Sequence, residues 1–479
     1  MSVTTPSAGA SPTGGFRLLS LPMPSLPITR VLLTQLYEAA VAGAATGPVT
    51  TRGVEALGIP RDRRVWLFSF GKAAHAMAGA AVGSLQRSLN QIAGGLIVAP
   101  NEDRSPYGTL AVMTGDHPVP GPRSFAAAQR IGEIAGRMKS GDVALVLVSG
   151  GATSLIAAPL RGMTEAELTQ LFELLLASGL DIGAVNAVRR RFTRWGGGRL
   201  ALAIAPAAAH CLAVSDVPGD DLATIGSGPS VPDQTTADDV IDILEEAKLI
   251  DRLPKSFHRY LLDVSRGAEP ETAKAGHPAF AHGSARVIAN NRGALDAAAE
   301  RARALGAGAV YVVDAPLVGE AAPAGDAIAR WLIELRDRSP APGALPAPRV
   351  AIWGGETTVT LRSHSSRKSA TPAPAPPGGR CQELALAAAR SLFAAGERGH
   401  GISLLAAGTD GRDGTTEAAG AFVDALTWSA IQRAGLDPEV ALAQHASNGA
   451  LGAVNALFSP GPTGTNVMDV IIGVVDGND

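Results

Sequence analysis

The sequence predicts an α/β protein in which helices cover the faces of largely parallel sheets. From Arg64 onward, short apolar or β-branched runs alternate with alanine-rich segments of helical length, which is the pattern of consecutive βα units. Apolar residues make up 46% of the chain and charged residues only 18%, so a chain of this length can bury a large core. Glycine accounts for 56 of the 479 residues, which indicates many tight loops between the elements.

The expected strands are short apolar runs that recur along the whole chain. Helices are expected between them over 72–89, 124–138, 164–177 and 293–305, each long enough to cover one face of a sheet. The strands end at or lie around Phe70, Ile97, Val112, Leu147, Val214, Ile288, Val312, Ile352, Leu405 and Ile472.

Composition divides the chain into expected domains. Residues 1–27 are rich in Ser, Thr, Pro and Gly and are expected to form a loose tail. The proline-rich segment 339–348 is interpreted as a linker, which places an N-terminal domain at 28–338 and a C-terminal domain at 349–479. A second such tract, 363–379, is either a flexible flap or an inert insertion.

Charge and cysteine content exclude several classes of protein. With 41 Lys and Arg against 44 Asp and Glu, the net charge is −3, which provides no basic excess for a nucleic-acid partner. The two cysteines are too few for a disulfide framework or a zinc site and favour a reducing compartment. The longest apolar stretch, 201–214, contains a proline and a histidine and is too short to span a membrane. No apolar signal segment begins the chain, so a cytoplasmic protein is expected.

The chemistry should lie in the loops that follow the strands, because ligands of open α/β sheets bind outside the carboxyl ends of the strands. Nearly every such loop combines glycine with a hydroxyl, a carboxylate or a cation. These loops are FGKAA around Lys72, TGDHPVPG around His117, VSGGATS around Gly150, SDVPGDD around Asp216, GSGPSVPD around Gly226, WGGETT around Glu356, GGRCQE around Arg380 and GTDGRDG around Asp410.

Two of these loops place a cation at the start of a predicted helix. Lys72 and Arg380 both occupy such a position, where a positive charge is unfavourable unless it faces an anion. The SGGATS loop, 149–154, offers backbone N–H groups that suit a phosphate, or else it is only a tight turn between a strand and a helix. The sequence contains neither a P-loop nor a strand-placed G-x-G-x-x-G.

Carboxylates gather in two loops, without histidine or cysteine companions. One loop holds Asp216, Asp220 and Asp221, and the other holds Asp410 and Asp413. Oxygen ligands favour a hard ion such as Mg²⁺, although each aspartate also suits an Asx turn. His117, in the loop TGDHPVPG, is either a general base or a residue that caps a turn.

Taken together, these loops resemble those of the class II glycerate kinases, the D-glycerate 2-kinase family with a MOFRL C-terminal domain. The likeness extends from about Leu32 to Val475. The matching stretches, in order, are GKAAHAMA, GDHPVPG, the SGG of SGGATSL, NAVRRRF with GGRL, SDVPGDD, GSGPSVPD, GGETTVTL, GGRCQELAL, GTDGRDGTTEAAGA and GPTGTNV.

The resemblance implies a large Rossmann-like N-terminal domain with a mainly parallel sheet, a smaller α/β MOFRL domain, and an active site in the cleft between them. It implies transfer of the γ-phosphoryl group of ATP to the C2 hydroxyl of D-glycerate, with Mg²⁺. In this interpretation the catalytic residues are Lys72, Arg380 and Asp216, and the metal ligands are Asp216 and Asp410. Nucleotide-binding residues would be Ser149, Gly150, Gly151, Thr153, Gly354 and Glu356, and acceptor-binding residues would be Asn186, Arg189 and Arg191.

Departures from the family pattern leave the identity of the acceptor open. This chain has Ala152, Thr153, Arg191, Gly196, Cys381 and Met468 where the family usually has other residues. One alternative is a kinase for another small hydroxy acid. The others are a hydroxypyruvate reductase, which the missing dinucleotide fingerprint disfavours, and a protein that binds a nucleotide without turnover. A homodimer is left open.

Overall fold

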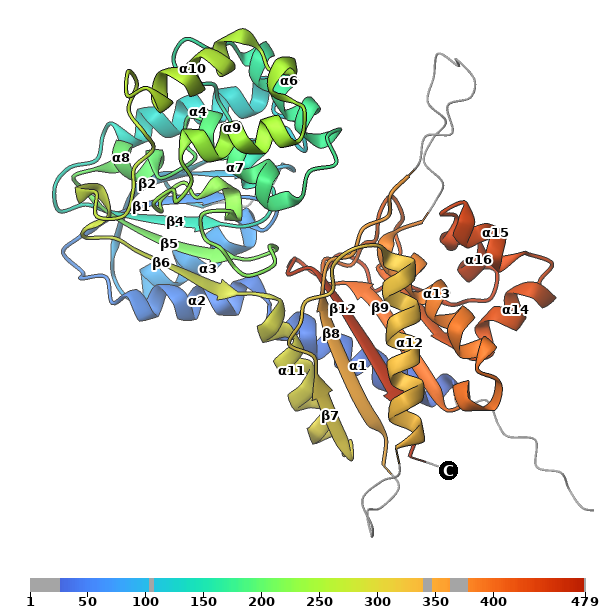
Figure 1. The fold of residues 1–479 in the computed structure, drawn as a ribbon. Helices are drawn as coiled ribbons and strands as arrows, with labels where there is room; N and C mark the ends of the chain where they lie inside the picture. The colour runs from blue at the N-terminus through green and yellow to red at the C-terminus, as the bar shows by residue number, and fades with distance from the viewer. Residues whose placement is uncertain (1–25, 103–106, 339–346, 362–377, 478–479) are drawn as a thin grey trace, which may run out of the picture.

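Two sheets of six strands each organise the fold, and they lie in two separate parts of the molecule (Figure 1). The computed structural model describes residues 26–102, 107–338, 347–361 and 378–477. The expected tail, most of the expected linker and nearly all of the 363–379 tract lie outside the described residues. The predicted fold class is confirmed, with a Rossmann-like parallel sheet in the N-terminal part and a smaller mixed sheet in the C-terminal part.

The first sheet has the order β3-β2-β1-β4-β5-β6, and all its pairings are parallel. This order reverses between β1 and β4, and at such a switch point the loops after the two strands diverge and leave a crevice. The strands are β1 (Arg64–Phe70), β2 (Gln91–Ala99), β3 (Leu110–Thr114), β4 (Val143–Val148), β5 (Ala208–Val214) and β6 (Ser284–Ala289).

Helices cover both faces of the first sheet. One face is covered by α2 and α3 and the other by α4 and α8, and a further helical layer is formed by α6, α7, α9 and α10 (Figure 1). The helices are α2 (Thr46–Leu57), α3 (Ala74–Arg87), α4 (Pro122–Ala135), α5 (Ala152–Leu155), α6 (Glu165–Leu176), α7 (Ile182–Phe192), α8 (Arg199–Ile204), α9 (Ala237–Glu246) and α10 (Lys255–Ser265).

The second sheet has the order β11-β10-β9-β12-β8-β7. Only β7 and β8 pair in parallel, and the other neighbours are antiparallel. The strands are β7 (Ala309–Val312), β8 (Arg349–Gly355), β9 (Ile402–Gly408), β10 (Gly420–Asp424), β11 (Leu457–Phe458) and β12 (Asp469–Val475). Helices α1 and α11 pack on one face, and α12 and α13 pack on the other. These helices, with the three that complete this part, are α1 (Leu26–Gly43), α11 (Asn291–Ala304), α12 (Ala321–Asp337), α13 (Arg380–Ala394), α14 (Thr427–Arg433), α15 (Pro438–Ala443) and α16 (Ser447–Gly452).

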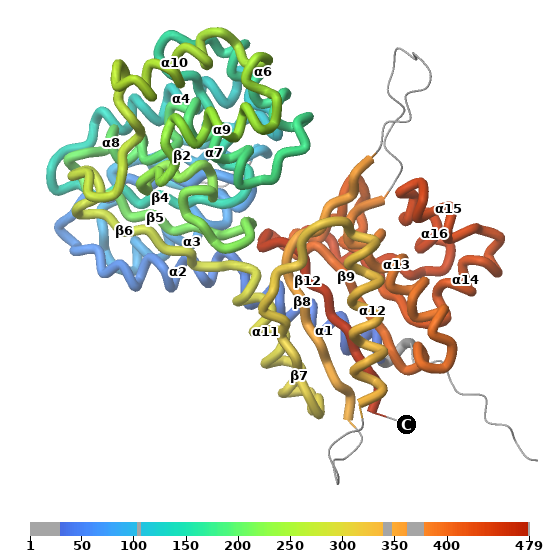
Figure 2. The backbone as a smooth tube through the Cα atoms, viewed as in Figure 1, coloured from blue at the N-terminus to red at the C-terminus, as the bar shows by residue number. Residues whose placement is uncertain are grey.

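The sheets divide the chain at a different place from the proline-rich segment. Strand β7 pairs with β8, so the second sheet takes in residues that the composition placed in the N-terminal domain. Helix α1, at the other end of the chain, also packs on this sheet (Figure 2). The backbone therefore crosses between the two parts twice, between α1 and α2 and between β6 and α11. Local composition identifies the proline-rich segment, whereas long-range strand pairing decides which sheet β7 joins.

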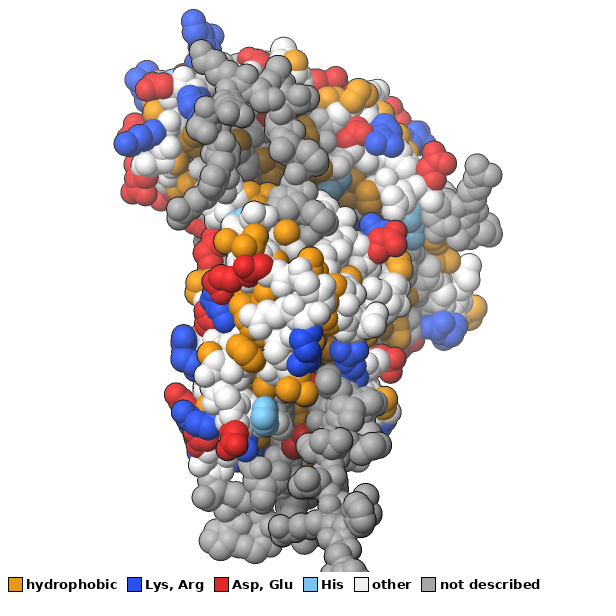
Figure 3. Space-filling model, turned by 90° about the vertical axis from the view of Figure 1, so that its right-hand side faces the viewer, with side chains coloured by type: hydrophobic (Ala, Val, Ile, Leu, Met, Phe, Trp, Pro, Cys, Tyr) orange, Lys and Arg blue, Asp and Glu red, His pale blue; other side chains and the backbone are white. Residues whose placement is uncertain are grey.

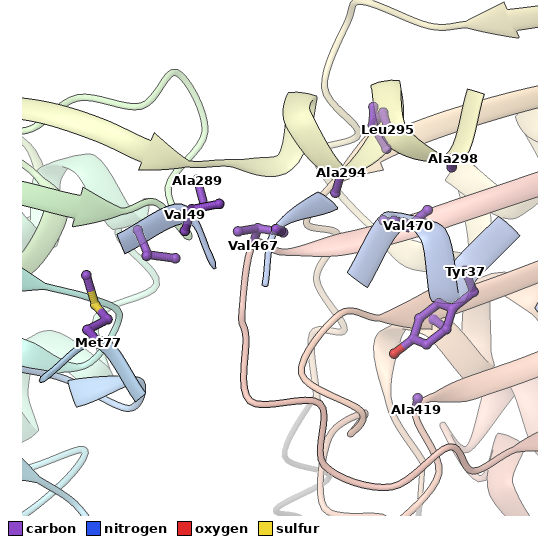
Figure 4. Packing of buried hydrophobic residues seen from close by; sticks show 14 of the residues in the cluster. Tyr37, Val49, Met77, Ala289, Ala294, Leu295, Ala298, Ala419, Val467 and Val470 are labelled. Atoms are coloured by element: carbon purple, nitrogen blue, oxygen red, sulfur yellow. The ribbon is translucent and has the colours of Figure 1, made fainter. Parts of the chain in front are cut away.

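One hydrophobic cluster continues across the junction between the two parts. It includes Val49 and Met77 in the first part and Leu295 and Val470 in the second. Figure 4 shows Val467 at the junction, between the side chains of the two parts. The apolar contact of the two parts should hold them at a defined distance, because their separation would expose this cluster to water.

The surface agrees with a chain of near-zero net charge. On the face shown in Figure 3, positive and negative side chains of the described residues are interspersed, with hydrophobic side chains between them. Among the described residues, no helix combines the length and the apolar character needed to cross a bilayer. Both Cys211 and Cys381 are buried and unbridged.

Candidate active site

A cleft of about 430 Å³ lies at the junction, where loops of both parts meet. The first part contributes the loops that follow β1, β2, β3 and β4, and the second contributes the loop after β9 and the segment before β12. The cleft is lined by Lys72, Ala73, Pro100, Asn101, His117, Ser149, Gly150, Val214, Asp410, Arg412, Pro462, Gly464, Thr465 and Asn466. It thus opens at the switch point of the first sheet, as the strand order requires.

Lys72 lies in the cleft, two residues after the end of β1. Its backbone N–H donates to the carbonyl of Gly150 at 2.9 Å, and the Ser149 hydroxyl accepts from the N–H of Ala73 at 3.1 Å and lies 3.3 Å from the carbonyl of Phe70. These bonds hold the loops after β1 and β4 together. The Lys72 side chain is exposed, and it makes no ion pair within the part of the chain that the structure describes.

Asp216 lies beside Lys72, after the end of β5. A Cβ atom on residue 150 would come within 1.9 Å of the Asp216 carboxylate, so Gly150 allows the carboxylate to approach the β4 loop closely. Burial raises the pKa of Asp216, and the Lys72 ammonium partly offsets this effect. A carboxylate of raised pKa next to an unpaired ammonium suits a proton acceptor in the cleft.

The predicted anion partner of Arg380 is a pair of carboxylates of the protein itself. The Arg380 guanidinium donates to both oxygens of Asp469, at 2.6 and 2.9 Å, and its Nη1 lies 2.9 Å from Glu356. The position of Arg380 at a helix start thus indicated a nearby anion. The anions are the carboxylates of Asp469 and Glu356, which already balance the positive charge of Arg380. Asp469, which sequence reasoning missed, has only a 3% exposed side chain.

Glu356 connects this cluster to the first part. Burial raises the pKa of Glu356, while Arg380 lowers it and the negative charges of Asp469 and Asp216 raise it further. The charges of Asp216 and Lys72, in the first part, also act on Glu356. Arg380 thus pairs with Glu356, and the charges of Lys72 and Asp216 act on the same carboxylate.

Two of the predicted phosphate contacts have other roles. Helix α5 after the SGG loop is a single turn of four residues, too short for a sizeable helix dipole. The Thr153 hydroxyl lies 3.0 Å from the Ser227 hydroxyl and has a partner within the protein. Ser149, Gly150 and Gly151 lie at the cleft end of β4, with Gly151 in the left-handed conformation at φ 82°.

Gly354 was predicted to contact the nucleotide, but it does not lie open to a ligand. A Cβ atom on this residue would lie 1.7 Å from the side-chain oxygen of Asn291. The glycine leaves room for a side chain of the protein, which is the same steric requirement that a close ligand would impose.

The three consecutive arginines of NAVRRRF differ sharply in their surroundings. Arg190 pairs with Asp233 at 3.1 Å, and the fully buried Arg191 pairs with Glu271 at 2.8 Å. Arg189 has no ion pair with any described residue, and its Nε and Nη2 atoms are buried without a hydrogen-bond partner. Burial lowers the pKa of Arg189 to about 10. The prediction that Arg191 binds the acceptor is corrected, since a side chain with no exposed surface cannot reach the cleft.

We expect Arg191→Ala to destabilise the protein by about 3–5 kcal/mol, because it removes a fully buried side chain together with its ion pair to Glu271 and one of the two cations near the buried Asp233. Urea unfolding measures this loss. Arg194→Ala is the matched control, because Arg194 is exposed and stacks on Trp195 at 4.7 Å; we expect it to cost less than about 1 kcal/mol. Unchanged stability of Arg191→Ala would contradict a structural role for this arginine.

His117 lines the cleft together with Lys72. Burial and the positive charges of Lys72 and Arg189 lower the pKa of His117. The imidazole is therefore neutral at pH 7 and adds no positive charge to the cleft. On the acceptor side, Asn186 is 7% exposed and lies one helical turn before Arg189, so the two side chains share a face of α7.

The remaining aspartates mostly cap turns. Asp221 accepts from Ala223 and Thr224. Asp413 accepts from the N–H groups of Cys381 and Gln382, at the start of α13, and burial raises its pKa to about 6. Asp410 lies in the cleft and accepts from the N–H of Arg412 at 3.0 Å, so it combines an Asx turn with a cleft position.

Arg412 is a further cation of the cleft that sequence reasoning did not single out. Its side chain is exposed and lines the cleft, and it makes no ion pair with the residues that the structure describes. The GTDGRDG motif could have indicated Arg412, because it places this arginine between two turn-forming aspartates in a loop that follows a strand.

The donor set fits an ion held largely by a bound nucleotide. Among the described residues there is no group of three or more His, Cys, Asp or Glu side chains that could hold a metal. The charge of Asp216 acts on Glu356. Mg²⁺ in phosphoryl-transfer sites usually takes one or two carboxylates, with phosphates and water as its other ligands, so these two residues fit such an ion.

A doubly wound sheet closed by a second α/β unit, with acidic and basic groups in the cleft, is the architecture of a two-domain α/β enzyme. A family model described as a domain of unknown function, DUF4147, matches residues 32–262, and the MOFRL family model matches residues 349–469. The chain belongs to the glycerate kinase family that combines these two domains, as the curated relatives show.

A D-glycerate 2-kinase of Thermotoga maritima is 33% identical over 414 residues, which cover 86% of this chain and 91% of that protein. A protein of Agrobacterium vitis with a provisional name as a hydroxypyruvate reductase is 35% identical, over 92% of this chain and 93% of the relative. The solved structure of a glycerate kinase from Thermotoga maritima superposes with a TM-score of 0.78 at 32% identity, and covers 94% of this chain and 100% of that chain.

Proposed function

We propose that this protein transfers the γ-phosphoryl group of ATP to the C2 hydroxyl of D-glycerate. The observation that carries the proposal is the Lys72 ammonium, which lines the cleft at the switch point of the first sheet, together with the buried Asp216 carboxylate, whose pKa burial raises and the Lys72 charge lowers. The named activity of the Thermotoga maritima relative supports the choice of acceptor and of its carbon.

Cations would bind and neutralise the phosphates. Phosphoryl transfer depends on position and on charge stabilisation more than on covalent help from the protein. Lys72 from the first part and Arg412 from the second line the same cleft, so both can reach the phosphates of one nucleotide. The backbone N–H groups of the SGG loop would approach the same phosphates.

Asp216 would accept the proton of the attacking hydroxyl. Its raised pKa moves it closer to neutral pH, where a general base is more effective. Asp216 and Glu356 are the residues that would hold Mg²⁺, with Asp410 also in the cleft. When bound, the ion would supply further charge neutralisation at the transferred group.

The acceptor carboxylate would bind to Arg189. This guanidinium is partly buried with two unpartnered nitrogens, and a planar guanidinium matches a carboxylate well. Asn186, on the same face of α7, would then contact a hydroxyl group. Arg380 would act indirectly, since Asp469 and Glu356 already bind it.

ADP release from ATP and Mg²⁺ over a panel of small hydroxy acids tests this function. We expect turnover with D-glycerate. Turnover only with a longer acid would instead favour a kinase of another hydroxy acid, and NADH oxidation with hydroxypyruvate would favour a reductase. No feature of the described structure favours the reductase.

A further inference from the structure

A buried asparagine lies at one of the points where the backbone crosses between the two parts. Asn291 is the first residue of α11 and follows β6, the last strand of the first sheet. Its side chain is 8% exposed, and both donated bonds of its amide go to backbone carbonyls, to Val467 at 2.7 Å and to Asp469 at 3.0 Å. Figure 4 shows Val467 at this junction.

The other side of Asn291 faces the end of β8. Its side-chain oxygen occupies the space that a Cβ atom on residue 354 would need, 1.7 Å away. In the second sheet Asp469 pairs with Gly355, and Val470 pairs with Gly354. Asn291 therefore touches both strands at the point where β8 ends and β12 begins.

These two strand ends carry the carboxylates that hold Arg380. Glu356 follows Gly355 directly, and Asp469 is the residue whose carbonyl accepts from Asn291. One side chain at the crossing thus contacts the backbone on both sides of the Arg380 cluster.

The preceding residue points back to the Asp216 loop. The Asn290 amide donates to Asp220, and the N–H of Ser215 donates to the carbonyl of Ala289 at 2.9 Å. Two consecutive residues therefore bind loops of the two parts. Asn290 binds the first part through Asp220, and Asn291 binds the second part through Asp469.

We propose that Asn291 is a positioning residue that holds the Arg380–Asp469–Glu356 cluster in register with the Asp216 loop. This role rests on the proposed kinase function, because it concerns the same cleft. A misplacement of about 1 Å can cost on the order of 10²-fold in rate. Asn291 would therefore affect the chemical step without touching either substrate.

The test compares kcat and KM in Asn291→Ala and Gly354→Ala. The second variant displaces the same side chain from its other face. We expect kcat for ADP formation to fall about 10- to 100-fold in both variants, while KM for ATP changes less than about threefold. Asn90→Ala is the matched control, because Asn90 is also 8% exposed and donates to two backbone carbonyls, those of Ile59 and Pro60, outside the cleft. It should lose stability and keep its kcat.

An unchanged kcat in folded Asn291→Ala would overturn the proposal. If that variant does not fold, Asn291→Ser retains a small donor, and the same comparison of kcat decides the question. Wild-type turnover is measured first, since a wild type that forms no ADP with any acid contradicts the kinase function alone. The positioning role is then tested by urea unfolding of Asn291→Ala, Asp469→Asn and the double variant, where purely additive shifts in midpoint would overturn it.

Discussion

Lys72→Ala is expected to lower kcat by about 10³-fold or more while the protein stays folded, since a cation on the transferred phosphoryl group contributes on the order of 10³ to 10⁵ in rate. The structure supports both parts of this expectation. The ammonium lies in the cleft without a carboxylate bound to it among the described residues, so its charge is available to a ligand. The side chain is exposed, so its removal leaves no cavity in the core.

Lys139→Ala is the control for a nonspecific loss of positive charge. Lys139 is also exposed, but it precedes β4. It therefore lies near the amino ends of the strands of the first sheet, whereas the cleft lies at their carboxyl ends. Its kcat should equal that of the wild type. A Lys72→Ala variant that keeps more than about a tenth of the wild-type kcat would contradict the assignment.

Asp216→Asn should lower kcat by about 10²- to 10⁴-fold, the range expected when a general base is removed. Substitution by asparagine preserves the shape that Gly150 accommodates and removes the negative charge, and with it the proposed proton acceptor and a proposed Mg²⁺ ligand. A base must be ionised to act, so wild-type kcat should fall as the pH drops through the raised pKa of Asp216. This acidic limb should therefore lie above the ordinary range of a carboxyl group, and a pH profile of kcat measures it.

The stability of Asp216→Asn provides the control. The pKa of Asp216 is higher in the folded protein than in the unfolded chain, so at neutral pH its ionisation opposes folding. Removal of this charge should leave stability at pH 7 unchanged or raised. A large loss of stability, or an acidic limb that persists in the variant, would show that Asp216 is not the base.

The sequence was sufficient to locate the residues of the parallel sheet. Lys72, Gly150 and Asp216 all follow parallel strands, and the carboxyl ends of such strands meet at one edge. The structure places Lys72 and Gly150 in the cleft and the Asp216 carboxylate against Gly150, so a local rule for glycine-containing loops after strands leads to this candidate site.

The antiparallel part of the second sheet explains what sequence reasoning missed. Strand β12 runs antiparallel to β8 and β9, so its first residue, Asp469, lies beside their last residues. A rule that searches only the loops after strands does not find Asp469, because this residue begins a strand. The charge rule for Arg380 has a similar limit, because it requires an anion without specifying whether a ligand or the protein supplies it.

Steric and long-range features were also beyond local patterns. Gly354 was predicted to contact the nucleotide, and the sequence does not show that the group against it is Asn291. Arg189, Arg190 and Arg191 look alike in sequence, and only the positions of Asp233 and Glu271 distinguish them. The division of the chain between the sheets depends on the pairing of β7 with β8, which composition does not reveal.

Phosphorus NMR of the product formed from D-glycerate, ATP and Mg²⁺ tests the central claim most directly. We predict one new phosphate ester, attached to C2, formed in equal amount with ADP and absent when Lys72→Ala replaces the wild type. An ester at C3, or ADP formed without any ester of glycerate, would contradict the assignment of this cleft as a site of phosphoryl transfer to the C2 hydroxyl.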